Sequence, residues 1–236
     1  MAGITDAKFL NKVIPFGFNV ATLGGYSLDA PTIEASEKII QRGRKEFVFP
    51  LNETFAHIEN EIASIKNVHS NVKVSVNVRS TTPQPIIDIG NIENLDIVEI
   101  NCHCRQEEIL NIGCGQEMLK RPDLGDFISQ VVDNVACEVS VKIRANVDGI
   151  DTLKIARLIE QAGADYLHID AMKKGVFDAD YNLLENICNN VQIKVIGNNS
   201  VNNEANAQKM IETGVNGFSI ARGVISGNLG FNISDF

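Results

Sequence analysis

Tryptophan is absent from this 236-residue sequence, while tyrosine occurs three times and proline six times. No apolar run approaches the roughly 18 residues that a membrane-spanning helix needs, and the first residues show no secretory signal. These absences predict a cytoplasmic protein that makes no contact with a membrane.

Basic residues are also scarce: 21 lysines and arginines stand against 30 aspartates and glutamates, which gives a formal net charge of −9 and a pI near 5.0. This balance argues against a broad electropositive face for nucleic acid. The five cysteines are an odd number with no extracellular marker, so we expect free thiols rather than a disulfide framework.

The composition is otherwise that of a globular protein, 44% hydrophobic and 22% charged, and suits a single domain over residues 1–236. Segments with strand spacing alternate with segments of helical spacing, which predicts a parallel sheet and favours a TIM (β/α)8 barrel over an open sheet. The expected strands are residues 18–22, 46–49, 72–78, 97–101, 139–144, 166–169, 193–196 and 217–220. The expected helices are residues 7–13, 30–42, 52–65, 86–92, 122–135, 151–162, 182–189 and 203–213, with a helical turn at 116–119.

Polar or glycine residues lie at or just past the ends of four of these strands. They are Asn101, Lys142, the pair Gly197-Asn198 and the pair Arg222-Gly223. Because the ligand site of a parallel α/β fold gathers at the carboxyl ends of its strands, we expect these residues to converge on one site.

Lys142 is the strongest single candidate for chemistry in this group. A buried ammonium at a barrel mouth can stabilise a developing anion, such as an enolate or the edge of a reduced flavin. A lysine at the end of a strand can equally extend its ammonium into solvent. Both interpretations stay open at this point.

The two late strand ends, Gly197-Asn198 and Ala221-Arg222-Gly223, have the composition of a phosphate site. In barrels the corresponding loops often hold a phosphate through backbone N–H groups, and an arginine can add a bidentate contact. Glycine permits the close approach that a Cβ would block. The alternative is a pair of ordinary tight turns.

Cys102-His103-Cys104, together with Cys114, offers thiols and an imidazole of the kind that zinc prefers. The spacing contains no Cys-x-x-Cys pair, so we predict no metal site. A single thiol acting as a general acid is the favoured interpretation, with Cys104 placed just past a strand end.

His168 and Asp170 lie on one face of a predicted strand because side chains alternate with period two. Asp170 is nearer the carboxyl end and is better placed for a ligand. His168 can be a ligand contact or a hydrogen-bonded histidine of the core.

Six segments, in the same order along the chain, resemble motifs of the dihydrouridine synthase family, flavin barrels related to the dihydroorotate dehydrogenases. The first resembles its MAGVTD motif, the second its NxGCP motif with the active-site cysteine, and the third a GAGSALLRDP-like stretch. The other three resemble later strand-end motifs. The segments are Met1 to Asp6, Glu99 to Arg105, Gly113 to Pro122, Val141 to Arg144, Ile196 to Asn198 and Ala221 to Gly223. The chain also resembles a short archaeal branch of the family.

This resemblance implies FMN at the barrel mouth, with Lys142 and Asn77 near the flavin ring. Asn101 would face the flavin or the pyrimidine. Cys104 would give a proton to one pyrimidine carbon while hydride passes to or from its neighbour.

The resemblance also implies further cofactor contacts, including a phosphate held at the two late strand ends. The residues concerned are Ala2, Gly3, Asp170, Gly197, Asn198, Ala221, Arg222 and Gly223.

Some positions depart from the family pattern. The glycine and proline beside the family's cysteine are His103 and Arg105 here, and its histidine on the sixth strand is Asp170. The IGNGD motif ends as Asn199-Ser200. These departures can change the direction of Cys104 and exchange a donor for an acceptor.

Two parts of the family architecture are not visible in this sequence. The helical domain that grips tRNA has no counterpart after Gly223, and Met1 aligns within the first motif, so the first strand is expected to be truncated and the start codon to lie upstream. A barrel without that strand has two free sheet edges, which favours a homo-oligomer.

Three functions follow from this sequence. The leading prediction is an FMN oxidoreductase, with NAD(P)H as electron donor, that acts on the C=C bond of a pyrimidine, in tRNA or elsewhere. The missing helical domain and the acidic charge favour the second, a dihydroorotate dehydrogenase-like enzyme on a free small molecule. The third is a non-catalytic relative that keeps the barrel, and a phosphate-binding barrel without redox chemistry is a variant of it.

Overall fold

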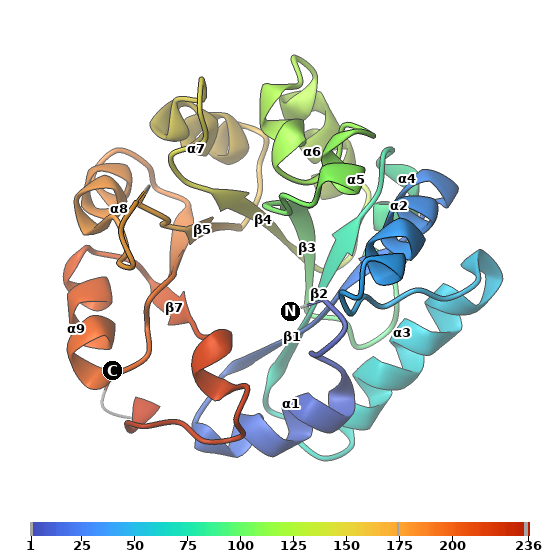
Figure 1. The fold of residues 1–236 in the computed structure, drawn as a ribbon, viewed down its shortest axis with the longest axis horizontal. Coiled ribbons are helices and arrows are strands. Elements are labelled where there is room, and N and C mark those ends of the chain that lie inside the picture. The colour runs from blue at the N-terminus through green and yellow to red at the C-terminus, as the bar shows by residue number, and fades with distance from the viewer. Residues whose placement is uncertain (1, 174, 234–235) are drawn as a thin grey trace.

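Seven parallel strands follow one another in sequence order around a strongly curved sheet, with helices on its outer face (Figure 1). The computed structural model describes residues 2–173, 175–233 and 236. The sheet curves round as a barrel does but is open between its first and last strands, β1 and β7. This arrangement confirms the predicted TIM-barrel-like α/β fold. The strands are β1 (Val20–Ser27), β2 (Lys73–Arg79), β3 (Ile97–Cys102), β4 (Glu138–Arg144), β5 (Tyr166–Asp170), β6 (Lys194–Asn198) and β7 (Gly217–Ser219).

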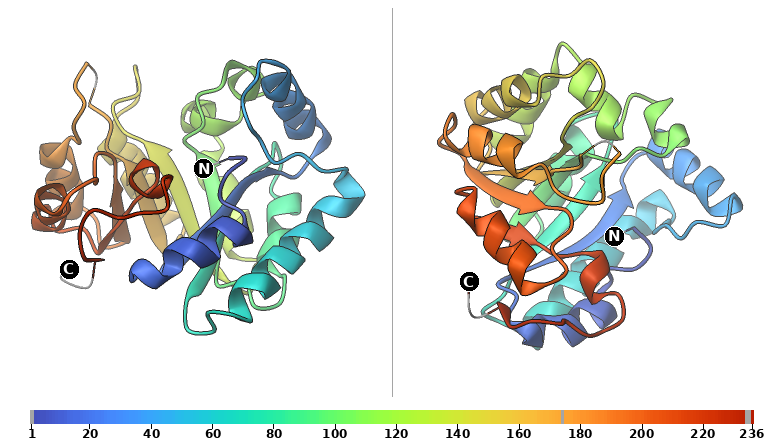
Figure 2. Two further views of the ribbon diagram at one scale, coloured as in Figure 1. Left: turned by 60° about the horizontal axis from the view of Figure 1, so that its bottom comes forward. Right: turned by 60° about the vertical axis from the view of Figure 1, so that its left-hand side comes forward.

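Helices connect the successive strands and cover the convex side of the sheet, as the two further views in Figure 2 show. Side-chain caps fix where several of them begin: Asp29, for example, forms a capping box with Thr32 at the start of α2. The α-helices are α1 (Ala7–Val13), α2 (Ala30–Gln41), α3 (Leu51–Lys66), α4 (Gln84–Gly90), α5 (Glu107–Leu110), α6 (Leu124–Val132), α7 (Thr152–Gln161), α8 (Tyr181–Cys188) and α9 (Glu204–Glu212). The 3-10 helices are η1 (Ile14–Phe16), η2 (Gly115–Lys120) and η3 (Arg222–Val224).

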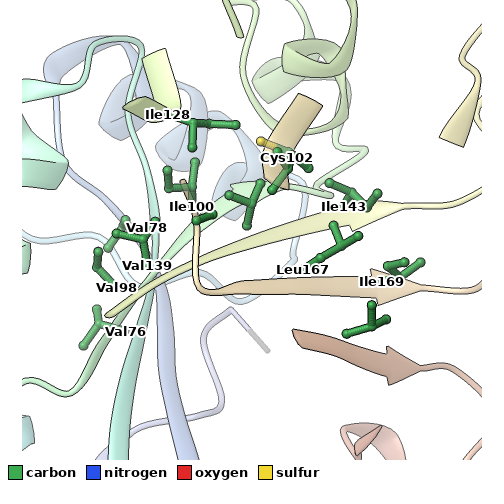
Figure 3. Close-up of a cluster of buried hydrophobic side chains, with 14 of the residues drawn as sticks. Val76, Val78, Val98, Ile100, Cys102, Ile128, Val139, Ile143, Leu167 and Ile169 are labelled. Carbon is green, nitrogen blue, oxygen red and sulfur yellow. The ribbon is translucent and has the colours of Figure 1, made fainter. Parts of the chain in front are cut away.

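Hydrophobic residues at alternate strand positions form the core between the sheet and its helices (Figure 3). Val98 and Ile100 of β3 are buried there beside Ile128 of α6, and Leu167 and Ile169 continue the layer on β5. The intervening positions must therefore face the concave side.

Those intervening positions are largely polar. The strand register sets Asn101 beside Lys142, and Lys142 beside His168, so that side chains of β3, β4 and β5 meet on the concave face. TIM-barrel interiors are usually filled by branched apolar residues. A polar interior at this level therefore indicates a functional site.

The predicted strand at 46–49 was wrong. This segment makes a single bridge, between Phe47 and Tyr26, at the free edge of β1. Pro50 caps α3, which begins at Leu51, so the chain turns away before a ladder can form. The helix α5 was not predicted. The strand β1 runs to Ser27, five residues beyond the predicted end at Thr22. The prediction stopped short because the pair Gly24-Gly25 has low strand propensity.

Other boundaries agree within a few residues, and α1 agrees at both ends. Met1, which belongs to the first of the family-like motifs, lies outside the described residues. Among the described helices, none is long and apolar enough to cross a membrane.

Candidate active site

Glu99 on β3 is the centre of a buried hydrogen-bond network inside the curved sheet. One carboxylate oxygen accepts from Asn77 Nδ2 of β2 at 2.8 Å. The other accepts from His168 Nδ1 of β5 at 2.6 Å and from Ser140 Oγ of β4 at 3.2 Å. Only 3% of Glu99 is exposed, and a carboxylate so deeply buried is tolerated only with such donors around it.

The same neighbours decide the ionisation of Glu99. Burial alone would raise the pKa of its carboxyl, but the positive charge held by His168 and Lys142 together, with the hydrogen bonds from His168 and Asn77, keeps that pKa well below its usual range. Glu99 is therefore a fixed negative charge under the mouth of the barrel.

Lys142 of β4 and Ser219 of β7 meet the other ring nitrogen of His168. Nε2 lies 3.2 Å from Lys142 Nζ and 2.7 Å from Ser219 Oγ. Because Nδ1 carries the proton donated to Glu99, the neutral ring has its lone pair at Nε2 and accepts there. Burial lowers the pKa of Lys142 and of His168, against the opposing charge of Glu99. Lys142 thus lies inside the site and does not extend into solvent as the alternative interpretation would have it.

Asn101 at the end of β3 shapes the loop that follows it. Its Nδ2 donates to Asn77 Oδ1 at 2.8 Å, and its Oδ1 accepts from the backbone N–H groups of His103 at 3.1 Å and Cys104 at 2.9 Å. A Cβ on Gly25 would stand 2.5 Å from Asn77 Oδ1, so this arrangement requires glycine there. Asn101 therefore holds the cysteine loop in place from below.

Cys104 is the accessible thiol of the motif. It is half-buried, with its side chain against the small cluster that contains Ile109 and Cys114, and its carbonyl accepts from Gln116 N at 2.8 Å. Cys102 points to the other side of the strand and is fully buried, with its thiol 3.8 Å from Met118 Sδ. Burial raises the pKa of the Cys102 thiol, which makes it an inert core group.

His103, Arg144 and Asp170 form a triangle at the ends of β3, β4 and β5. Asp170 Oδ2 lies 2.7 Å from His103 Nε2 and 3.0 Å from Arg144 Nη2, while its Oδ1 accepts from Asn199 Nδ2 at 2.8 Å. Two sequence departures, the histidine beside the cysteine and the aspartate on the sixth family strand, thus contact each other. Both carboxylate oxygens of Asp170 are engaged by protein groups.

The triangle perturbs the ionisation of its members. Burial lowers the pKa of His103 to about 4, although Asp170 opposes this shift. Burial alone would raise the pKa of Asp170, but the hydrogen bond from His103 and the charge of Arg144 lower it to about 2. At neutral pH the imidazole is therefore neutral and the carboxylate is ionised.

We expect the free energy of unfolding to fall as the pH drops from about 6.5 to about 4, because His103 binds a proton in this window when unfolded but not when folded. A shift from 6.5 to about 4 corresponds to about 3 kcal/mol. Urea unfolding of the wild type and of His103→Asn across this range checks the prediction, and the variant should show a shallower decline. Parallel curves between about pH 6.5 and 4 would contradict the prediction. Above about pH 7, where His103 is neutral in both states, the two curves should run parallel.

The predicted phosphate residues come together at the ends of β6 and β7, but they are not equivalent. Gly197 is buried, and a Cβ there would stand 2.4 Å from Met210 Sδ, so its glycine is needed for packing against α9. Asn198 Nδ2 donates to Ser219 O at 2.9 Å and ties the two strands together. Arg222 is exposed at the start of η3, between Ala221 and Gly223, and makes no ion pair with the described residues. Of these residues, Arg222 and its neighbours are the ones available to a ligand.

The loop after β6 has an unusual backbone. Asn199 and Ser200, which replace the glycine and aspartate of the family motif, have φ values of 105° and 57°. Non-glycine residues rarely adopt positive φ, and such strain clusters at ligand sites. The family's glycine is the residue that this backbone would favour.

Ala2 and Gly3 lie in the N-terminal turn, beside the segment before α3. Gly3 has φ 70°, and a Cβ there would stand 2.6 Å from Lys45. The adjacent Glu46 forms a buried ion pair with Arg79 of β2 at 2.7 Å. The glycine is thus explained by close packing, while a cofactor contact from Ala2 or Gly3 stays a prediction.

Several residues of the site were missed at the level of sequence: Glu99 and Ser140 under Lys142, Ser219 on β7, and Arg144 beside Asp170. A usable signal existed for Glu99, which interrupts the run Val98-Glu99-Ile100 with a charge that must find buried partners. For Ser140 and Ser219 the sequence offers no such signal.

The alternative of a metal cluster gains nothing from the structure. Cys102 and His103 face different sides, and no grouping of three or more His, Cys, Asp or Glu side chains suited to a metal occurs in the part of the chain described.

Comparison with known proteins decides the family. The dihydrouridine synthase (Dus) family model matches residues 46–228. The chain belongs to the dihydrouridine synthase family. It is 36% identical over 240 residues to an uncharacterized protein of Methanocaldococcus jannaschii, and the aligned region covers 97% of this chain and 88% of that protein.

Less similar relatives carry the name of tRNA-dihydrouridine synthases. The tRNA-dihydrouridine synthase B of Vibrio vulnificus is 25% identical, over 94% of this chain and 65% of its own length. A mouse tRNA-dihydrouridine(20a/20b) synthase [NAD(P)+]-like protein is 27% identical, over 55% of this chain and 42% of its own length. The matches thus span about two thirds or less of these two proteins.

Solved structures support the fold alone. FabK from Thermotoga maritima matches with a TM-score of 0.53 over 95% of this chain and 62% of its own, at 14% identity. Thiamine phosphate pyrophosphorylase from Pyrococcus furiosus matches with a TM-score of 0.52 over 94% of this chain and 84% of its own, also at 14% identity. Identity at this level carries no functional argument.

Proposed function

We propose that this dihydrouridine synthase family member is an FMN-dependent oxidoreductase that reduces the ring C=C bond of uridine in tRNA, with NAD(P)H as electron donor. The observation that carries the proposal is the loop after β3. Asn101 holds Cys104 at the mouth of a polar barrel interior, where Lys142 is half-buried against His168. Family membership and the names of the relatives support the same chemistry.

The residues at the mouth fit FMN. Lys142 and Asn77 lie in the network inside the barrel, where they would line the ring. The first backbone N–H groups of η3 have no side-chain cap, and such groups, with the Arg222 guanidinium, suit a phosphate. Gly223 permits close approach, since a Cβ there would already stand 3.1 Å from Ile220.

The flavin would supply hydride transfer, and the chain's own groups would supply the rest. The Lys142 ammonium would stabilise negative charge that develops near it. The Cys104 thiol would hold the proton that the second carbon of the C=C bond receives. The loop hydrogen bonds of Asn101 would keep that thiol in position.

A free small molecule remains the second candidate substrate. The observation that favours it is the net charge of −9, which is unfavourable for a tRNA backbone. Dihydrouridine content of tRNA after incubation with enzyme, FMN and NADPH, beside oxidation of NADPH with orotate or uracil alone, separates the two. Turnover of free pyrimidine with unchanged tRNA would replace the leading substrate.

We expect the purified protein to retain a flavin absorbance spectrum after incubation with FMN and desalting. Arg222→Ala should lose most of the bound flavin because the phosphate contact is removed, whereas Lys154→Ala, on the exposed side of α7, should retain it. Absorbance of the desalted protein measures the retained fraction. A colourless wild type with a folded circular dichroism spectrum would contradict flavin binding by this chain.

A further inference from the structure

Lys142 and His168 form a pair of basic groups in direct contact within the barrel interior, beneath the mouth. Their nitrogens are 3.2 Å apart, and His168 is 5% exposed. His168 lies two positions before Asp170, on the same face of β5. Its ring is held on one side by Glu99 and on the other by Ser219.

We propose that Lys142 and His168 share one acidic proton above Glu99, so that Glu99 and His168 are positioning residues that set the protonation state of Lys142. In the absence of a further anion, the geometry favours one cation over two. If both groups were charged, two cationic nitrogens would lie 3.2 Å apart, with Ser219 Oγ as the acceptor for the Nε2 proton and one carboxylate, Glu99, in contact with the pair. With one proton, the imidazole accepts from the ammonium while Nδ1 donates to Glu99.

The charges around the pair lead to the same count. The groups that act on it are Glu99 from β3, Arg144 from β4 and Asp170 from β5, with the hydroxyl of Ser219 from β7. Arg144 and Asp170 are paired with each other at 3.0 Å. Glu99 is then the one carboxylate left to balance the pair, and it balances a single positive charge.

Two consequences follow from a shared proton. Removing Lys142 should transfer the positive charge to His168, because Glu99 still requires a cation beside it. An anion that forms at the mouth should draw a second proton into the pair. The second consequence rests on the proposed function, whereas the first belongs to the protein alone.

The test therefore uses the protein without cofactor. Protein labelled with ¹⁵N-histidine is titrated while long-range ¹H–¹⁵N correlation spectra report the protonation of each ring nitrogen, and His168→Gln identifies the resonance. In the wild type at neutral pH we expect the neutral tautomer with its proton on Nδ1. In Lys142→Met we expect an imidazolium, with a titration midpoint at least one pH unit higher.

Lys154→Met, on the exposed side of α7, is the matched control and should leave the His168 resonance unchanged. An imidazolium in the wild type, or a neutral ring in folded Lys142→Met, would overturn the proposal. Lys142→Leu takes the place of Lys142→Met if the latter does not fold. Neither result depends on the proposed dihydrouridine synthase activity, because the experiment contains no flavin or RNA.

Discussion

Glu99→Gln is expected to destabilise the protein by about 3–5 kcal/mol, the loss seen when one partner of a buried ion pair is removed. The amide keeps the size of the side chain but not its charge, so the cation shared by Lys142 and His168 loses its counter-charge. Its NH2 group must also face a donor, either Asn77 Nδ2 on one side or His168 Nδ1 and Ser140 Oγ on the other. Urea unfolding measured by circular dichroism gives the difference in the free energy of unfolding.

A second substitution separates charge from packing. Glu99→Gln with Lys142→Met removes both charges and should recover part of the loss, because no buried cation then lacks a partner. Glu138→Gln is the matched surface control. Glu138 pairs with Lys73 at the other end of the sheet, where both are partly exposed, and its loss should cost less than about 1 kcal/mol. A loss for Glu99→Gln as small as that of the control would show that the charge of Glu99 is not needed.

The fold was largely predictable because its determinants are local. Alternation along 139–144 and 166–169 marked the inner strands, and the residue types at their ends marked the site. The predicted strand at 46–49 was wrong because only Phe47 bridges to the free edge of β1 before the chain turns into α3 at Pro50. Such pairing is a tertiary condition and has no local signal.

The site was less predictable, since its side chains are close only in three dimensions. Glu99, Lys142 and His168 are on three adjacent strands, and their contacts depend on the register between those strands. His103 and Asp170 are each a departure from the family pattern, and the sequence alone gives no sign that they meet at 2.7 Å. In the sequence, each departure indicates the loss of a family residue. In the structure, the two substituted residues contact each other.

This pairing has a consequence for the cysteine loop. In place of the family's glycine and proline, the loop is held at two points: by Asn101 through the backbone of Cys104, and by Asp170 through the side chain of His103. The loop therefore has its own means of keeping one conformation. Its role in catalysis then depends on what the thiol of Cys104 does.

Cys104→Ala is expected to lower the rate of dihydrouridine formation by about 10²–10⁴-fold, the contribution typical of a positioned general acid. The backbone contacts of the loop are made by N–H and C=O groups, which alanine keeps. The thiol is half-buried and makes no hydrogen bond with the described residues, so little stability should be lost. Flavin retention should be unchanged, which distinguishes a lost proton donor from a lost cofactor.

Cys102→Ala is the control within the same motif, because that thiol is fully buried on the opposite side of the strand. It removes core packing beside Met118 and should lower the free energy of unfolding by about 1 kcal/mol or more, with the rate per folded, flavin-loaded enzyme unchanged. The two variants are compared by single-turnover reduction of tRNA with pre-reduced enzyme, which isolates the chemical step. Equal rates for wild type and Cys104→Ala would remove Cys104 as the acid. The candidate proton donor would then be Lys142, because burial lowers the pKa of its ammonium and so makes it a stronger acid.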